Sequence, residues 1–151
     1  MKFDFGTKGM LSMQHLTYKR VWIALGFLML ATVVYASLTS VPHVFRTIML
    51  HDKLAHSAAY ASLMVLFAQL FRHDLTRLLL VIGLILFGFA MEYFQGMVPY
   101  RRFDYLDMLA NSVGVILAWG LAYTWFGDLV VKAEQLYDRL NSMGSLSVQS
   151  T

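Results

Sequence analysis

The chain has 151 residues, of which 58% are hydrophobic and 14% are charged. A soluble domain has about a quarter of its residues charged, so this composition excludes an ordinary water-soluble fold and indicates a single membrane domain. The chain has no cysteine, which excludes disulfides and cysteine-ligated metals, and its net charge of +3 comes without a basic, aromatic-rich run typical of nucleic-acid binding.

Four apolar stretches follow one another along the chain. They are residues 21–40, 54–71, 78–96 and 105–126. The first carries no charge, and the others are interrupted by His56, Glu92 and Asp107, respectively. A helix of about 20 residues spans the hydrocarbon core, and lipid gives an unpaired backbone no hydrogen-bonding partner. The sequence therefore predicts an all-α, polytopic membrane helix bundle with about four transmembrane helices within residues 21–126.

The segments outside these stretches are more polar. Residues 1–20 form a leading segment, and the run at 21–40 is longer than the roughly 7–15 apolar residues of a signal peptide, which favours an uncleaved anchor. Residues 41–51 are expected in the outer interface. Residues 127–141 have a roughly helical apolar pattern that either extends the last span or lies on the membrane surface. Residues 142–151 are serine-rich and are predicted to be disordered.

The basic residues predict the orientation. Eight lie on one side of this topology and four on the other: Lys2, Lys8, Lys19, Arg20, Arg72, Arg77, Lys132 and Arg139 against Arg46, Lys53, Arg101 and Arg102. Cytoplasmic loops carry the excess of Lys and Arg, so both termini, including the tail at 127–151, are predicted in the cytoplasm.

Polar residues form a stripe on each of the last three spans. The stripes are Asp52, His56 and Tyr60 with Lys53 beside them, then Glu92 and Gln95, and finally Asp107, Asn111 and Gly114. Residues three or four positions apart share a helix face. The start of the second span, the end of the third and the start of the fourth lie on the same side, so the stripes should meet at the outer face. Polar groups cost about 2.5–3.5 kcal/mol each at mid-membrane on insertion scales, so this cluster must pair internally, line a wet pocket or bind a ligand.

Each group also has a simpler interpretation. Lys53, Arg101 and Arg102 could be snorkelling interface residues, and Tyr60 could belong to an aromatic belt. His56, Asp107 and Asn111 could serve only interhelical hydrogen bonding or helix capping. Glu92 is the hardest to explain in this way, because an acid within an apolar run is a functional candidate by default. The glycines of the last two spans, Gly83, Gly88, Gly114 and Gly120, are expected to permit close helix packing.

The same polar residues resemble the VanZ-like family of bacterial membrane proteins. The resemblance lies in D-K-L-A-H-S-A-A-Y at 52–60, E-Y-F-Q at 92–95 and P-Y-R-R-F-D-Y-L-D-M-L-A-N-S-V-G at 99–114, and covers about residues 50–120. It implies a multi-pass protein of the bacterial cytoplasmic (inner) membrane with a loose link to the cell envelope. It implies no settled biochemical activity, and it does not assign glycopeptide resistance to this chain.

Three functional hypotheses remain open at the sequence level. In the first, an enzyme acts on an anionic lipid or lipid-linked envelope precursor, with His56, Glu92 and Asp107 as candidate catalytic residues. His56 would be the general base or acid, with Asp52 or Glu92 as its orienting partner. Its candidate substrate-binding residues are Asp52, Lys53, Tyr60, Gln95, Arg101 and Asn111. The second is a binding protein without turnover, and the third is a structural cap of paired polar residues. A Mg²⁺ site is chemically possible, but the spacing does not direct one, so no metal is assigned and the cofactor is unknown. The expected partners are membrane lipids, and the oligomeric state is left open.

Overall fold

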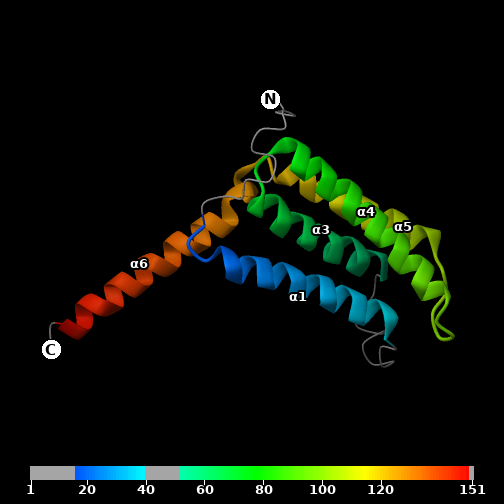
Figure 1. Ribbon diagram of the computed structural model, residues 1–151, viewed down its shortest axis with the longest axis horizontal. Coiled ribbons are helices and arrows are strands. Elements are labelled where there is room, and N and C mark those ends of the chain that lie inside the picture. Colours follow the sequence, from blue (N-terminus) through cyan, green and yellow to red (C-terminus); the bar gives the residue numbers. More distant parts are fainter. Residues whose placement is uncertain (1–15, 40–51, 150–151) are drawn as a thin grey trace.

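The computed structural model describes residues 16–39 and 52–149. This part of the chain is helical and contains no β-strand. Its elements are α1 (Lys19–Leu38), α3 (Asp52–Leu70), α4 (Asp74–Gly96), α5 (Tyr105–Leu121), the 3₁₀ helix η1 (Trp125–Asp128) and α6 (Leu129–Gln149). The helices α1, α3, α4 and α5 form a bundle, and α6 leaves one end of it (Figure 1). The all-α prediction is confirmed.

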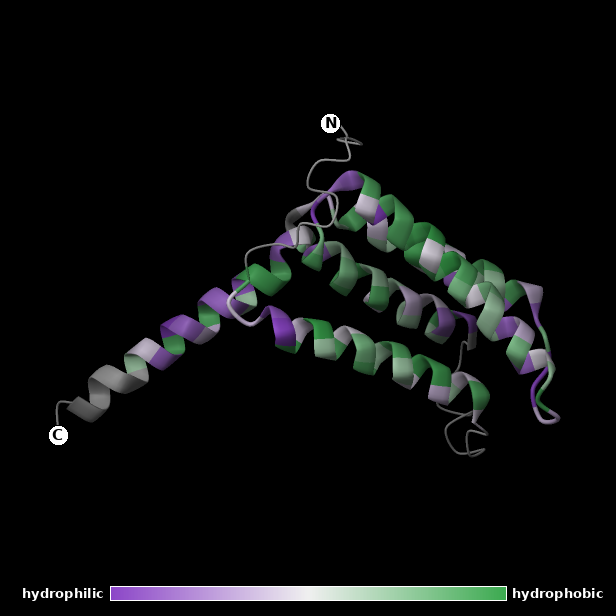
Figure 2. Cartoon of the chain, in the orientation of Figure 1, coloured by the Kyte–Doolittle hydropathy of each residue, from purple (hydrophilic) through white to green (hydrophobic). Residues whose placement is uncertain are grey.

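The central helix of the bundle is α3, which contacts α1, α4 and α5. Its side chains Leu63, Met64 and Ala68 are fully buried. They pack with apolar residues of the neighbouring helices, namely Val81 and Leu84 of α4 and Val115 and Ala118 of α5. The outer faces of α1 and α4 are apolar and exposed, as the green surfaces in Figure 2 indicate. This distribution is the one expected when lipid replaces water around the bundle.

Helices α3 and α5 approach each other closely at Gly114. At Gly114, a Cβ atom would overlap the backbone carbonyl oxygen of Ser57. At Gly88 of α4, a Cβ would lie 3.3 Å from both Asn111 Cβ and Tyr60 Cε1. These two glycines therefore serve the packing predicted for them. Gly83 and Gly120 do not, because a Cβ at either position would meet no atom within 4 Å.

Two helices, α1 and α4, are long and apolar enough to cross a membrane, and a third span results if α5 and the bent continuation over Phe126–Met143 count as one. The prediction of four spans is thus borne out only in its coarser form, a helical protein with two or three segments long and apolar enough to cross a membrane. α5 has 17 residues, a length of about 25 Å against a hydrocarbon core of about 30 Å. α3 carries Asp52, Lys53 and His56 in its first two turns.

One of the less regular segments can be compared with prediction. The helix α6 runs to Gln149, so residues 142–149 are helical where the serine-rich composition predicted disorder. Serine is only modestly unfavourable in a helix, and here it follows a stretch that is already helical. The segments 1–15 and 40–51 lie outside the described residues, including the interfacial location expected for 41–51.

The bundle has two chemically different ends. We call the end where α1 and α4 terminate and α3 and α5 begin the polar end. The opposite end, where α1 and α4 begin and α6 departs, is the α6 end. All the candidate site residues from the sequence belong to the polar end.

Candidate functional site

Lys53 joins α3 to the start of α5. Its Nζ lies 2.8 Å from Asp104 Oδ2 and 2.8 Å from Asp107 Oδ1. The lysine and Asp104 are largely exposed, whereas the Asp107 side chain is 9% exposed. The contact with Asp107 therefore neutralises a buried carboxylate, and Lys53 is engaged within the protein rather than extended toward headgroups.

Glu92 connects α4 to the same place. Its Oε1 accepts a hydrogen bond of 2.8 Å from the backbone N–H of Asp104. Asp104 in turn caps α5, because its Oδ1 accepts from the N–H of Leu106 at 2.8 Å. Glu92 is 1% exposed, and its Oε2 has no hydrogen-bond partner in the described part of the chain.

His56 faces α5. Its Nδ1 lies 3.2 Å from Asn111 Oδ1, and its Nε2 lies 3.7 Å from Asp107 Oδ2. The second distance is too long for a hydrogen bond but short enough for a favourable electrostatic contact. The sequence hypothesis paired His56 with Asp52 or Glu92. In the structure, His56 instead lies beside Asp107 and Asn111. The side chain of Asp52 is outside the described part of the chain.

Arg101 fastens α1 at the polar end. Its Nη2 donates to the carbonyl oxygens of Ala36 at 2.8 Å and Thr39 at 3.0 Å, and Tyr100 donates its hydroxyl to Leu38 O at 2.8 Å. The last carbonyls of a helix carry partial negative charge, so a cation is stabilised there. The Nε and Nη1 of Arg101 donate to no described residue, which leaves part of the guanidinium available.

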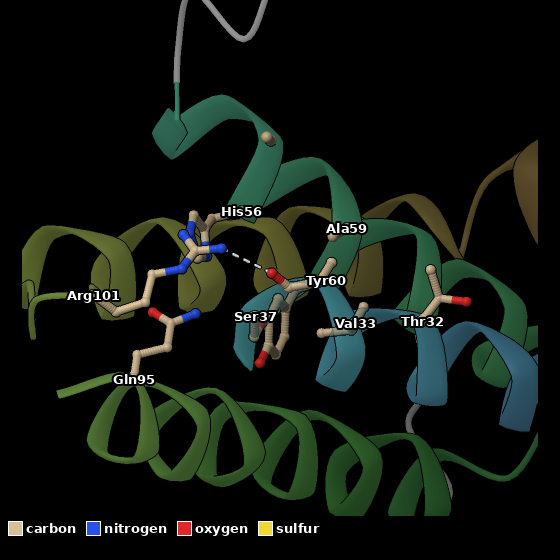
Figure 3. A pocket seen from close by; sticks show the side chains of 10 residues that line it. Thr32, Val33, Ser37, His56, Ala59, Tyr60, Gln95 and Arg101 are labelled. Carbon is tan, nitrogen blue, oxygen red and sulfur yellow. Dashed lines mark hydrogen bonds between the residues drawn. The ribbon is translucent and has the colours of Figure 1, made fainter. Parts of the chain in front are cut away.

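A hollow of about 220 Å³ lies between these groups (Figure 3). Its lining comes from α1, α3, α4 and the α4–α5 connection, and comprises Thr32, Val33, Ala36, Ser37, Ala55, His56, Ala59, Tyr60, Gln95 and Arg101. Gln95, Arg101 and His56 gather at one end, and Val33 and Thr32 lie toward the other (Figure 3). Pockets that bind drug-sized ligands have volumes of about 300–1,000 Å³. The hollow therefore has room for one polar end of a longer amphiphile.

The hollow presents buried polar groups without internal partners. The Gln95 side chain is 3% exposed, and its amide makes no hydrogen bond within residues 16–39 and 52–149. The Tyr60 side chain is 2% exposed, and its hydroxyl has no partner in the same residues. Buried polar groups are nearly always hydrogen-bonded, so each exception calls for a bound water or ligand.

The charge facing the hollow is positive. Arg101 is the permanently charged residue of the lining, and none of the described lining residues is a carboxylate. Asp104 and Asp107 share the charge of Lys53 outside the lining. An anionic group in the hollow would thus meet a guanidinium and an amide donor, and no carboxylate among the described lining residues.

Comparisons of the chain with protein-family models, curated proteins and solved structures find no match. The interpretation of the site therefore depends on its own chemistry.

The convergence of the three polar stripes is confirmed by these distances. Four of the predicted site residues line the hollow: His56, Tyr60, Gln95 and Arg101. Lys53, Glu92, Asp107 and Asn111 lie behind it and hold the helices together. Tyr60 is a buried core residue rather than part of an aromatic belt. Among the described residues, no group of three or more acidic, histidine or cysteine side chains is arranged to hold a metal ion.

Sequence reasoning missed the contribution of α1. Val33, Ala36 and Ser37 line the hollow, yet α1 carries no charge after Arg20 and its small residues give no chemical signal. It also counted Arg77 only as a loop charge. The structure buries Arg77 at 4% exposure, where its Nε and Nη2 donate to Ala68 O and its Nε also to Phe71 O, satisfying the end of α3.

Proposed function

We propose that this chain is a VanZ-like integral membrane protein of the bacterial envelope whose polar end binds the anionic headgroup of a lipid or a lipid-linked envelope precursor. The observation that carries this proposal is the hollow itself. It combines a partly unused guanidinium, an unpartnered buried amide and an apolar wall. An amphiphile with an anionic end satisfies all three at once.

The membrane arrangement is part of the proposal. All four bundle helices cross the bilayer, both termini lie in the cytoplasm, and the polar end faces outward in the inner membrane. The short α5 and the polar start of α3 are accommodated because α3 is enclosed by its neighbours and its polar residues pair with α5. A helix surrounded by protein does not need to be apolar on every face.

The geometry favours binding over turnover. Both ring nitrogens of His56 lie near α5, with Nδ1 beside Asn111 Oδ1 and Nε2 beside Asp107 Oδ2. A general base needs a nitrogen within hydrogen-bonding reach of the proton it removes. Glu92 is likewise committed through Oε1 to the backbone of Asp104.

A structural cap is the second candidate. It is favoured by the contacts of Lys53, which tie α3 to Asp104 and Asp107 without any ligand. In a bilayer, helix association depends on packing and interhelical hydrogen bonds, because lipid is as apolar as the helix surfaces. A structural cap alone provides no hydrogen-bonding partner for the amide of Gln95 or the hydroxyl of Tyr60.

A substitution at Gln95 distinguishes lipid binding from a purely structural cap. We expect native mass spectrometry of the wild type, extracted in mild detergent, to show a bound anionic lipid. Gln95→Leu removes a ligand donor without breaking any hydrogen bond among the described residues, so it should weaken lipid retention about tenfold or more while the protein stays folded. Arg101→Gln should do the same, with an additional loss of the contacts to α1.

The matched control is Arg102→Gln, which removes an exposed cation from the same connection and should retain the lipid. If the wild type carries no lipid, or if all four proteins carry the same one, the binding proposal is wrong and the structural cap remains.

A further inference from the structure

The helix α6 has an apolar stripe that the bundle leaves uncovered. Leu129, Ala133, Leu136, Leu140 and Met143 follow one another at alternating spacings of four and three, so they lie on one helix face. Leu136, Leu140 and Met143 are 59%, 60% and 68% exposed. A stripe of this size on an otherwise polar helix indicates a surface that meets an apolar partner.

The direction of α6 points to the membrane as that partner. The axis of α5 and the segment Phe126–Met143 differ by 86°, and α6 extends away from the bundle end (Figure 1). If α5 runs along the membrane normal, α6 runs almost in the membrane plane.

The side of α6 that carries the stripe is the side that faces the bilayer. Leu129 and Ala133 line an apolar hollow of about 420 Å³ together with Trp22 of α1 and Val65 and Leu66 of α3. These α1 and α3 residues lie farther into the bundle than the start of α6. The stripe is therefore continuous with the apolar outer surface of the bundle, and it points toward the hydrocarbon rather than toward water.

The charges of α6 are arranged to match a lipid surface. Lys132 lies three residues after Leu129 and four before Leu136, and Arg139 lies three after Leu136 and four before Met143. Both cations therefore border the stripe. Asp138 has only polar residues at these spacings: Glu134, Gln135, Asn141 and Ser142. Cations beside an apolar face and acids opposite it are the pattern of helices that bind anionic membranes.

A buried carboxylate fixes this orientation. Glu134 Oε2 accepts from Thr17 N at 2.8 Å, and its Oε1 accepts from Tyr18 N at 3.0 Å and Trp22 Nε1 at 2.8 Å. The rings of Tyr137 and Tyr18 meet edge to face with centroids 5.5 Å apart. These contacts hold one side of α6 against the start of α1 and leave the stripe facing the lipid.

From these observations we infer that α6 is an in-plane amphipathic helix that inserts its apolar stripe into an anionic membrane leaflet at the α6 end. The inference requires that the bundle spans a bilayer, but it does not depend on the headgroup site at the polar end.

The chain has no native cysteine, so single-cysteine spin labels can test the inference in the full-length protein. The probe is a vesicle of phosphatidylcholine and phosphatidylglycerol. Leu136→Cys, Leu140→Cys and Met143→Cys report the stripe, Gln135→Cys and Asp138→Cys report the opposite face, and Leu86→Cys reports the lipid-facing side of α4. Collisional access to oxygen and to a water-soluble nickel complex is measured at each position.

We expect the three stripe positions to favour oxygen, at a depth of about 5–10 Å below the headgroup level, and the opposite face to favour nickel. Nickel access at all five α6 positions, with Leu86 in lipid, would overturn the inference and leave the spanning bundle intact. Stripe positions shielded from both reagents would also overturn it, since they would indicate contact with protein such as a second copy. Nickel access at Leu86 would overturn both the inference and the spanning bundle.

Discussion

Asp104 links three helices through separate atoms. Its Oδ2 accepts from Lys53 of α3, its Oδ1 caps the first turn of α5, and its backbone N–H donates to Glu92 of α4. The hydrogen bond from Lys53 and the bond from Leu106 N–H both hold the pKa of this carboxyl below its ordinary value of 3.8. The charged form is therefore favoured by the folded state.

This depressed pKa predicts an acid-dependent loss of stability. The contribution of the Asp104 charge is present above its unfolded pKa and is lost as the pH falls through the lower folded value. Asp104→Asn keeps an oxygen that can cap α5 but removes the charge. The Tm of the wild type should exceed that of the variant above about pH 5, and the difference should shrink progressively as the pH falls below 3.8. Thermal unfolding in detergent, followed by tryptophan fluorescence, measures both curves.

Asp138→Asn is the matched control, because Asp138 is exposed and the hydrogen bond that its Oδ1 accepts from the Tyr18 hydroxyl is long, at 3.4 Å. Its Tm should follow the wild type over the same pH range. A constant difference between wild type and Asp104→Asn from pH 7 to about pH 3 would show that the charge of Asp104 is not what stabilises this end.

At the scale of elements, α1 packs on α3 and α4 and is also bound at both of its ends. Its described helical residues include one buried residue, Gly26. Arg101 binds the last carbonyls of α1, and the Glu134 carboxylate binds the N–H groups before its first turn. A cation at the end of a helix and an anion at its start both complement the helix dipole. Burial raises the pKa of Glu134, but the hydrogen bonds from Tyr18, Thr17 and Trp22 outweigh it and leave the pKa below its ordinary value.

Removing the carboxylate should free the start of α1. In Glu134→Gln, one oxygen is replaced by a donor that faces the N–H groups of Thr17 or Tyr18. Hydrogen bonds to charged groups contribute about 1.5–3 kcal/mol, so amide hydrogen exchange over residues 17–22 should quicken about 10- to 150-fold. Exchange at the other end of α1, near Ala36, should not change. Unaltered exchange at residues 17–22 would contradict the role given to Glu134.

The contact of α3 with α5 gives a second prediction at this scale. Gly114→Ala introduces a Cβ that overlaps Ser57 O, so the helices must separate. We expect a loss of about 1–3 kcal/mol in unfolding free energy, as for overpacked cores. Gly120→Ala is the control: its Cβ meets open space, and alanine favours a helix over glycine by about 1 kcal/mol. Equal Tm values for the two variants would contradict the close approach.

Apolar runs predicted the helices well but their ends less so. The stretch at 105–126 stays apolar, yet α5 stops at Leu121 and η1 begins at Trp125. The turn there brings the backbone of Gly127 against Ala122 O, where a Cβ would not fit. Hydropathy does not register such a turn, because lipid-compatible residues also form it. The three polar stripes were predictable because helical spacing and alternating topology alone bring them together.

The partners within the site were less predictable. Sequence spacing brought His56 and Glu92 to one end of the bundle but could not determine which acid each would face. That choice depends on helix rotation, which Gly88 and Gly114 set by admitting Asn111 and Ser57 at short range. Glu134 did carry a signal: it lies four residues after Val130 and three before Tyr137, on the face that packs against the bundle.

For the whole molecule, the proposed topology predicts which surfaces are accessible from outside the cell. Arg102 at the polar end and Gln135 on α6 are both exposed, and the chain has no native cysteine. Arg102→Cys should react with an impermeant maleimide in intact cells, and Gln135→Cys should react only after lysis. The reverse pattern would invert the orientation. Labelling of both in intact cells would place the two ends on the same side and contradict a spanning bundle.

The hydrogen bonds of Arg101 and Glu134 to the two ends of α1 also have a consequence for the order of assembly during synthesis. Synthesis delivers α1 first, but Arg101 and Glu134, the residues that hold its two ends, are translated after α4 and α5, respectively. In a bilayer, α1 can pack against α3 and α4 as they are made, but its two end contacts form only after the ribosome has completed most of the chain. The absence of charge between Val21 and Leu38 suits this interval, because this stretch of α1 can stay in lipid before its end contacts form.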